Sequence, residues 1–249
     1  MMNTFNIFTL FPDMFKVLDY GILGIAKDKG IIKINTVNIR DFSANKHKKV
    51  DDYPYGGGFG MLMTCQPVFD AVNSVPKAHT VYMSPKGKVL TQKRAMELSK
   101  INNINILCGH YEGIDRRIVD SLVDEELSCG DYILSGGEIP AMILIDCVSR
   151  LIDGVLPQPE SYLEESHTDN LLESHQYTRP EVYNGMAVPS ILLSGHHKNI
   201  EEFRLAQSIY ITLLNRPDML RRRKITKTEL KVFLIYYPQL KDDIIVYVE

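Results

Sequence analysis

The feature that most constrains the fold is the alternation of strand-like and helix-like segments over the first 150 residues. Apolar or alternating runs typical of β-strands occur at residues 5–10, 31–39, 81–83 and 104–108. Helical patterns follow at residues 12–27, with Pro12 at the helix start, and at residues 91–99 and 138–152. Strands that alternate with helices predict an α/β fold with a mostly parallel sheet.

The regular pattern of strand-like and helix-like segments stops after Gly154. Residues 156–175 include Pro157 and Pro159 and show little apolar periodicity, which favours a flexible linker that is too polar to pack on its own domain. Helical patterns return at residues 199–214 and 227–236. We therefore expect an α/β domain at residues 1–155, a flexible linker at residues 156–175 and a small helical domain at residues 176–249.

Composition excludes several classes of protein. The chain has 249 residues, of which 45% are hydrophobic and 24% are charged, as in an ordinary globular protein. Its first residues lack the basic start of a signal peptide, and no stretch has the apolar length needed to span a bilayer. The four cysteines show no C-x-x-C spacing, so we expect reduced thiols and a cytoplasmic protein: Cys65, Cys108, Cys129 and Cys147.

The net charge of −3 conceals an uneven distribution. Residues 197–231 carry nine Lys/Arg against four Asp/Glu, whereas residues 110–173 carry fifteen acids against three arginines. Such a chain is suited to anchoring a polyanion at its basic end while another part does chemistry.

Three turn-rich loops suggest a ligand pocket. Residues 82–87 and 109–113 leave predicted strands, and residues 130–138 precede the predicted buried helix. Because the carboxyl ends of neighbouring parallel strands form the ligand crevice of an open α/β sheet, these loops can line one pocket. None contains G-x-G-x-x-G or glycines followed by G-K-[ST], which disfavours a nicotinamide dinucleotide or ATP. A small ligand held by backbone groups fits better.

A fourth glycine-rich segment, residues 51–60, combines aromatic side chains with an unhindered backbone. It reads either as a flexible hairpin tip or as a surface on which a nucleic-acid base stacks. The basic run just upstream, residues 46–49, favours the second interpretation modestly.

Several of these segments together resemble the bacterial tRNA (guanine-N1)-methyltransferase family, of the TrmD type in the SPOUT class. The matching segments occur in the family's order and spacing: Asp41-Phe42 and residues 46–58, 109–117, 130–138, 177–181 and 192–197. They cover nearly the whole chain. The resemblance implies a deep trefoil knot in the α/β domain, a rare exception to the rule that chains do not thread.

The resemblance also implies the reaction and the partners. The donor is S-adenosylmethionine (AdoMet), and the acceptor is N1 of the guanosine just 3′ of the anticodon, position 37 of tRNA. The enzyme works as a homodimer whose active sites are shared between subunits. The expected donor-binding residues are Tyr82, Ser84, Pro85, Gly109, Tyr111, Glu112, Cys129, Gly130, Asp131, Tyr132, Ile133, Leu134, Gly136, Gly137 and Pro140. We expect Gly109→Val to weaken donor binding while leaving the fold intact.

The chemistry needs a carboxylate and a cation. Guanine N1 carries a proton at neutral pH, so a base must remove it, and the negative charge that then builds on O6 needs stabilisation. By resemblance the cation is Arg150, and the base position holds Glu165 where the family has an aspartate; Asp169 is the nearby alternative. Glu112 is the carboxylate best placed for a magnesium ion, which the resemblance implies. The expected tRNA-binding residues are Tyr55, Gly56, Gly57, Gly58, Ser166, Arg221, Arg222, Arg223 and Lys224.

Two other functions stay open at this point. One is a non-catalytic RNA-binding protein that keeps a degenerate AdoMet fold. The other is an unrelated Rossmann oxidoreductase, which the missing phosphate motif disfavours. The segment Leu156-Pro157-Gln158-Pro159 also departs from the glycine and acidic residues of the family, and we expect it to stiffen the linker.

Overall fold

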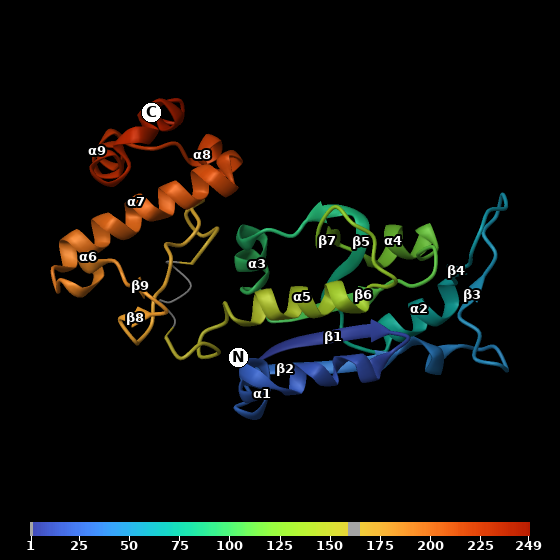
Figure 1. The fold of residues 1–249 in the computed structure, drawn as a ribbon. Coiled ribbons are helices and arrows are strands. Elements are labelled where there is room, and N and C mark those ends of the chain that lie inside the picture. The colour runs from blue at the N-terminus through green and yellow to red at the C-terminus, as the bar shows by residue number, and fades with distance from the viewer. Residues whose placement is uncertain (1, 159–164) are drawn as a thin grey trace. The chain divides into compact units, whose positions relative to one another are not determined.

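A computed structural model describes residues 2–158 and 165–249 of the chain (Figure 1). Pro159 and the residues up to 164, which belong to the predicted linker, lie outside the described residues. The chain divides into two compact units, residues 1–159 (unit 1) and residues 160–249 (unit 2). Among the described residues, no helix is both long enough and apolar enough to cross a membrane.

Unit 1 is built on a five-stranded sheet in the order β2-β1-β6-β5-β7, and every neighbouring pair is parallel. Its strands are β1 (Asn3–Thr9), β2 (Ile32–Asn38), β5 (His79–Val89), β6 (Asn103–Cys108) and β7 (Glu125–Ser128). β1 and β6 are central strands, and they are buried along nearly their whole length because helices cover both faces of the sheet. The predicted α/β architecture with a mostly parallel sheet is confirmed.

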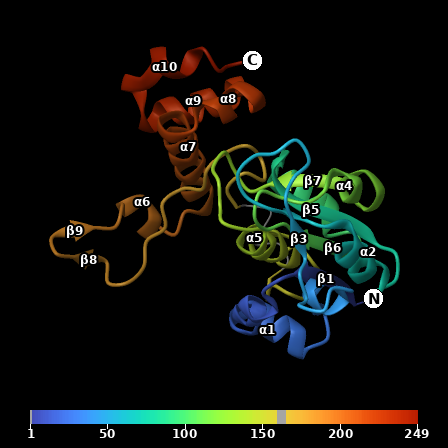
Figure 2. The ribbon, with the colours of Figure 1, turned by 90° about the vertical axis from the view of Figure 1, so that its right-hand side faces the viewer.

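Helices cover both faces of this sheet (Figure 2). On one face lie α2 (Cys65–Asn73) and α4 (Arg116–Leu122), with the short 3₁₀-helix η2 (Ile39–Phe42). On the other lie η1 (Pro12–Asp19), α1 (Gly21–Asp28), α3 (Gln92–Leu98) and α5 (Glu138–Ser149). The helix predicted over residues 12–27 is therefore broken in two. The break falls between Tyr20, which is extended, and Gly21, the first residue of α1, whose φ of 64° cannot continue the preceding helix.

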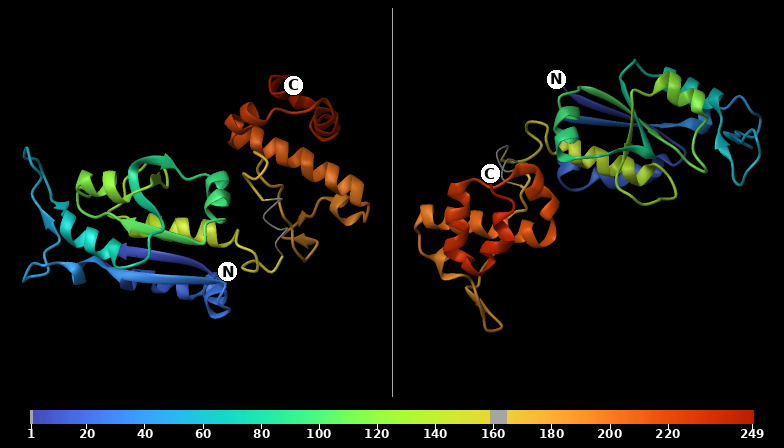
Figure 3. Two further views of the ribbon diagram at one scale, coloured as in Figure 1. Left: turned by 180° about the vertical axis from the view of Figure 1, so that it is seen from behind. Right: turned by 90° about the horizontal axis from the view of Figure 1, so that it is seen from above.

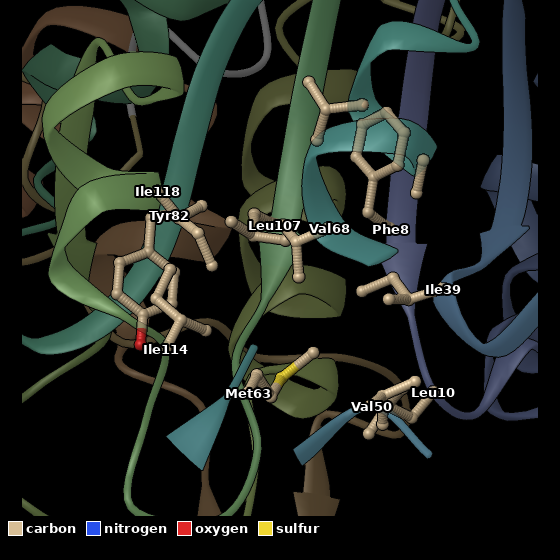
Figure 4. Close-up of a cluster of buried hydrophobic side chains, with 12 residues drawn as sticks. Phe8, Leu10, Ile39, Val50, Met63, Val68, Tyr82, Leu107, Ile114 and Ile118 are labelled. Carbon is tan, nitrogen blue, oxygen red and sulfur yellow. The ribbon is translucent and has the colours of Figure 1, made fainter. Parts of the chain in front are cut away.

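The core between the sheet and the α2/α4 face joins residues from many elements (Figure 4). Phe8 and Leu107 supply the sheet side, Val68 comes from α2 and Ile118 from α4. Met63 belongs to the small antiparallel pair β3 (Asp51–Asp52) and β4 (Leu62–Met63), so this core also anchors the glycine-rich segment that joins those two strands.

A row of polar side chains crosses the sheet, and all but the half-buried Asn35 are buried. Asn35, Asn6, Asn105 and Thr80 occupy paired positions on β2, β1, β6 and β5. Asn35 donates to Asn6 at 2.9 Å, and Asn6 donates to Asn105 at 3.0 Å. These bonds satisfy amides that would otherwise be costly to bury, and they fix the register of three neighbouring strands.

Unit 2 is a helical bundle around the long helix α7 (His197–Asn215), against which other helices of the unit pack (Figure 3). Its other elements are α6 (Ser190–Leu193), α8 (Pro217–Arg223), α9 (Lys227–Tyr236), η4 (Pro238–Leu240), α10 (Lys241–Ile245) and the hairpin of β8 (Val182–Tyr183) and β9 (Met186–Ala187). Its core holds Ile209, Leu220, Ile225, Phe233 and Ile244.

Residues 165–175 belong to unit 2 and are hydrogen-bonded to α7. The backbone N–H of Leu172 donates to Thr212 Oγ1 at 2.8 Å, and that of His175 donates to Gln207 Oε1 at 2.8 Å. Leu171 packs against the core of the unit. This differs from the expectation that the segment is too polar to pack on its own domain, because buried polar side chains of α7 satisfy its backbone.

Candidate active site

A cavity of about 470 Å³ opens at the carboxyl edge of the sheet in unit 1. The three loops singled out in the sequence line it, together with Leu62 of β4. Of the fifteen expected donor-binding residues, Gly130 and Asp131 do not line the cavity and the others do. The structure therefore brings these loops together, as the strand order predicts for an open α/β sheet.

The first loop arises from an irregularity in β5. Its pairing with β7 shifts register between Met83 and Lys88, so the intervening residues leave the ladder and form a wall of the cavity. A side chain at Gly87 would come within 2.4 Å of the backbone of Glu126, so only glycine allows the loop to lie this close to β7.

The third loop returns from β7 to the end of β6. Gly137 donates its N–H to the carbonyl of Gly109 at 2.8 Å, and a side chain there would lie only 2.8 Å from the Cα of Cys108. α5 starts at this contact with the buried Glu138, whose carboxylate accepts a hydrogen bond from Thr9 at 2.8 Å. The glycine thus lets the start of α5 close one side of the cavity.

Tyr82 lies between the cavity and the core. Burial, with a smaller effect of the neighbouring Glu126, raises the pKa of Tyr82 to about 12, so the phenol is neutral. A side chain at Gly109 would come within 2.7 Å of the Tyr82 hydroxyl. Valine at position 109 would therefore displace the Tyr82 ring as well as fill ligand space, so Gly109→Val does not probe donor binding alone.

Glu112, the candidate magnesium ligand, is exposed at the cavity wall. Its backbone N–H donates to Met61 at 3.0 Å, which ties the loop of residues 109–113 to the glycine-rich segment. Within residues 2–158 and 165–249, no three His, Cys, Asp or Glu side chains gather into a metal site. The described residues therefore do not support a magnesium ion bound by protein ligands alone.

The candidate catalytic residues belong to different units. Arg150 caps the C-terminal end of α5 in unit 1, whereas Glu165 and Ser166 lie in unit 2, and all three are half-buried. Asp169 accepts a hydrogen bond from Arg223 at 2.9 Å, so this alternative base is held in an ion pair. Glu165 stays the predicted base by the resemblance alone, and Asp169 stays the alternative.

The candidate tRNA-binding residues fall into two groups. Tyr55 and the glycines at 56–58 are exposed at the tip of the segment between β3 and β4, and these glycines all have positive φ. In unit 2, Arg221, Arg222 and Lys224 are exposed. Arg223 is not: its side chain is 17% exposed and pairs with Glu229 at 2.6 Å as well as with Asp169. Its guanidinium therefore supports the fold of unit 2.

Sequence reasoning missed two charged residues of the cavity, Arg116 and Glu126. Glu126 lies on β7, whose first residues are both acidic and so carry no apolar strand signal. Arg116 begins α4 directly after the loop of residues 109–113, and nothing in its local sequence marks it as part of a pocket.

Comparison with known proteins now adds the family. Residues 2–222 match the family model described as tRNA (Guanine-1)-methyltransferase TrmD. A tRNA (guanine-N(1)-)-methyltransferase of Ruminiclostridium cellulolyticum is 55% identical over 224 residues, or 88% of this chain and 96% of the relative. One of Caldanaerobacter subterraneus is 55% identical over 91% of this chain and 95% of the relative, and one of Clostridium botulinum is 49% identical over the same shares. The resemblance seen in the sequence is confirmed, and the chain belongs to the tRNA (guanine-N1)-methyltransferase family.

Proposed function

We propose that this enzyme transfers a methyl group from AdoMet to N1 of the guanosine at position 37 of tRNA, in the cytoplasm. The observation that carries the proposal is the loop-lined cavity at the carboxyl edge of the parallel sheet, in a chain of this family. Unit 1 binds the donor, and unit 2 supplies much of the affinity for tRNA.

The cavity suits AdoMet in size and in chemistry. Its volume of about 470 Å³ lies within the ordinary range for a small-molecule site. Gly136 and Gly137 form a close-packed cradle, since a side chain at either would meet atoms less than 3 Å away. When bound, AdoMet supplies an electrophilic methyl group with a good leaving group, so the protein's task is chiefly to position the acceptor and expose its lone pair.

The path of the chain around the cavity supports a trefoil knot. Leu90 donates to the carbonyl of Ser128 at 2.8 Å, which holds the end of the first loop against β7. Residues 129–137 then return from β7 to the end of β6, where Gly137 contacts Gly109. We infer that this returning segment passes through the first loop, as the family implies.

Two side chains account for the proton and the charge. Glu165 removes the N1 proton of guanine, and Arg150 stabilises the negative charge that develops on O6. Asp169, which pairs with Arg223 at 2.9 Å, is the alternative base.

A homodimer with shared sites is supported by an exposed apolar face on unit 1. Phe11 and Met14, at η1, and Ile139 of α5 are each at least 41% exposed and together line a second cavity of about 200 Å³. Val17 and Ile143 add to the exposed apolar surface of the same two elements. A second copy of the chain that covers this face would bury it. The family implies that Glu165 of one subunit then acts at the donor cavity of the other.

The test is transfer of tritium from labelled AdoMet to two tRNA transcripts that differ only in carrying guanine or adenine at position 37. We expect label in the guanine transcript, recovered as N1-methylguanosine, and none in the adenine transcript. The alternative, a non-catalytic RNA-binding protein, would bind the guanine transcript and transfer nothing.

A further inference from the structure

The donor cavity contains an ion pair, Arg116–Glu126, that has no role in the proposed donor or tRNA site. Arg116, at the start of α4, and Glu126, on β7, both line the cavity, and their Nη1 and Oε1 atoms are 3.4 Å apart. Charge-assisted hydrogen bonds between such groups are ordinarily about 2.7–2.9 Å long, so this pair is loosely joined. A loose pair of opposite charges in a ligand cavity can open to accept a ligand that carries both charges.

The fold fixes Glu126 more firmly than Arg116. Glu126 is paired in register with Tyr82 of the adjacent strand β5, and residues in direct register share one face of a sheet. The Glu126 side chain is 21% exposed, so it faces the cavity from a mostly buried position. Arg116 is 71% exposed and also pairs with Asp120, one helical turn later in α4, at 2.8 Å.

The remaining walls of the cavity differ in character. Ile133, Leu134, Pro140 and the glycines offer apolar surface and backbone groups, which suit an adenosine. AdoMet also has an amino-acid end, which carries an ammonium and a carboxylate on the same carbon. An acidic and a basic side chain within hydrogen-bonding distance of each other complement those two groups.

We propose that Arg116 and Glu126 bind the amino-acid end of AdoMet, Arg116 donating to its carboxylate and Glu126 accepting from its ammonium. This assignment rests on the proposed function, because it concerns the donor of that reaction. Lys86 and Glu112 also line the cavity and are the alternative partners for the same two charges.

The experiment measures binding by calorimetry with two ligands. S-adenosylhomocysteine keeps the amino-acid end, and methylthioadenosine lacks it. Arg116→Gln and Glu126→Gln should each lower the affinity for S-adenosylhomocysteine by roughly tenfold, as expected for the loss of one hydrogen bond between charged groups. The affinity for methylthioadenosine should stay within about twofold of the wild-type value. Decarboxylated AdoMet, which keeps the ammonium and lacks the carboxylate, separates the two roles. Glu126→Gln should lower the affinity for this ligand, and Arg116→Gln should leave it unchanged.

Arg117→Gln is the matched control. Arg117 is the next residue, is equally exposed and pairs with Asp115 at 2.7 Å, but it does not line the cavity, so both ligands should bind normally. The assignment is overturned if Arg116→Gln and Glu126→Gln bind S-adenosylhomocysteine as tightly as the wild type. It is also overturned if these two variants lose affinity equally for S-adenosylhomocysteine and methylthioadenosine. The same holds if Lys86→Gln and Glu112→Gln, instead of these variants, selectively lose affinity for S-adenosylhomocysteine. If the wild type binds neither ligand, the proposed function itself fails.

Discussion

At the scale of single residues, the basic cluster of unit 2 divides by burial. Arg223 is enclosed by two carboxylates, those of Glu229 and Asp169, and Glu229 also accepts from the backbone of Thr226 in a capping box at the start of α9. The exposed Arg221 belongs to the same α8 turn. The four neighbouring basic residues 221–224 therefore differ in role: Arg223 stabilises unit 2, and the exposed members are available to bind tRNA. Only their packing distinguishes them.

Arg223→Gln should lower the free energy of unfolding by roughly 1–3 kcal/mol, because it leaves Glu229 without its strongest partner in a mostly buried site. Arg221→Gln should change that free energy by no more than about 0.5 kcal/mol. It should instead reduce the slope of log tRNA affinity against log salt by about 0.9, the contribution of one phosphate contact. Urea denaturation and a salt titration measure the two quantities. Equal loss of stability in both variants would contradict this division.

Glu229 should also make unit 2 sensitive to acid. Burial alone would raise the pKa of Glu229, but hydrogen bonds from Arg223 and Thr226 outweigh burial and lower the pKa below its ordinary 4.5. The stabilisation is therefore fully present above pH 4.5 and is lost as the pH falls through the lower folded value. The Tm advantage of the wild type over Glu229→Gln should shrink as the pH is lowered from about 6 to about 3.5. Glu201→Gln, an exposed acid on α7, should show no such trend.

At the scale of elements, the sequence predicts the strands whose burial is nearly complete. β1 and β6 stand out as apolar runs because both of their faces are covered. The sequence does not predict β7 because two of its four residues are acidic and the strand has little apolar surface. Glu125 pairs with Arg94 and His79, and Glu126 faces the cavity. The sequence also does not predict the break between η1 and α1, because the apolar pattern continues across Gly21. Only the backbone changes there, to a positive φ at Gly21.

The cavity loops, too, could be predicted from the sequence only in part. Their glycines mark turns in the sequence, and the α/β pattern places those turns at one edge of the sheet. The reason for each glycine is visible only in space, since Gly87 and Gly137 each press against the backbone of a segment distant in the chain. Arg116 starts α4 and Glu126 lies on β7, so only the packing of these two elements brings them together, and no local pattern encodes it.

Asn105→Ala tests the polar row across the sheet. The change should cost roughly 2–4 kcal/mol, because it opens a small cavity and leaves the buried amide of Asn6 without its acceptor. Asn103→Ala, two residues earlier on the same strand but exposed, is the control and should stay within about 0.5 kcal/mol of the wild type. Denaturant unfolding measures both. A near-neutral Asn105→Ala would show that this row contributes little to the sheet.

At the scale of the whole molecule, the proposed active site is shared between two copies of the chain. The donor cavity and Arg150 lie in unit 1, and Glu165 lies in unit 2. The exposed apolar face around Phe11 and Ile139 is the surface that a second copy would cover. Glu165 must reach a guanine whose stacking in the anticodon loop has been broken, at a cost of roughly a few kcal/mol. A base supplied by the partner would complete the site around bound RNA.

Mixing Arg150→Ala protein with Glu165→Gln protein tests this central claim most directly, with tritium transfer to the position-37 guanine transcript as the readout. Each variant alone should be nearly inactive. After demonstrated subunit exchange, a shared site gives every heterodimer one intact site, so up to half of the wild-type activity per heterodimer should return. If Arg150 and Glu165 act from the same chain, every site keeps one defect and no activity returns, and that result would contradict the account.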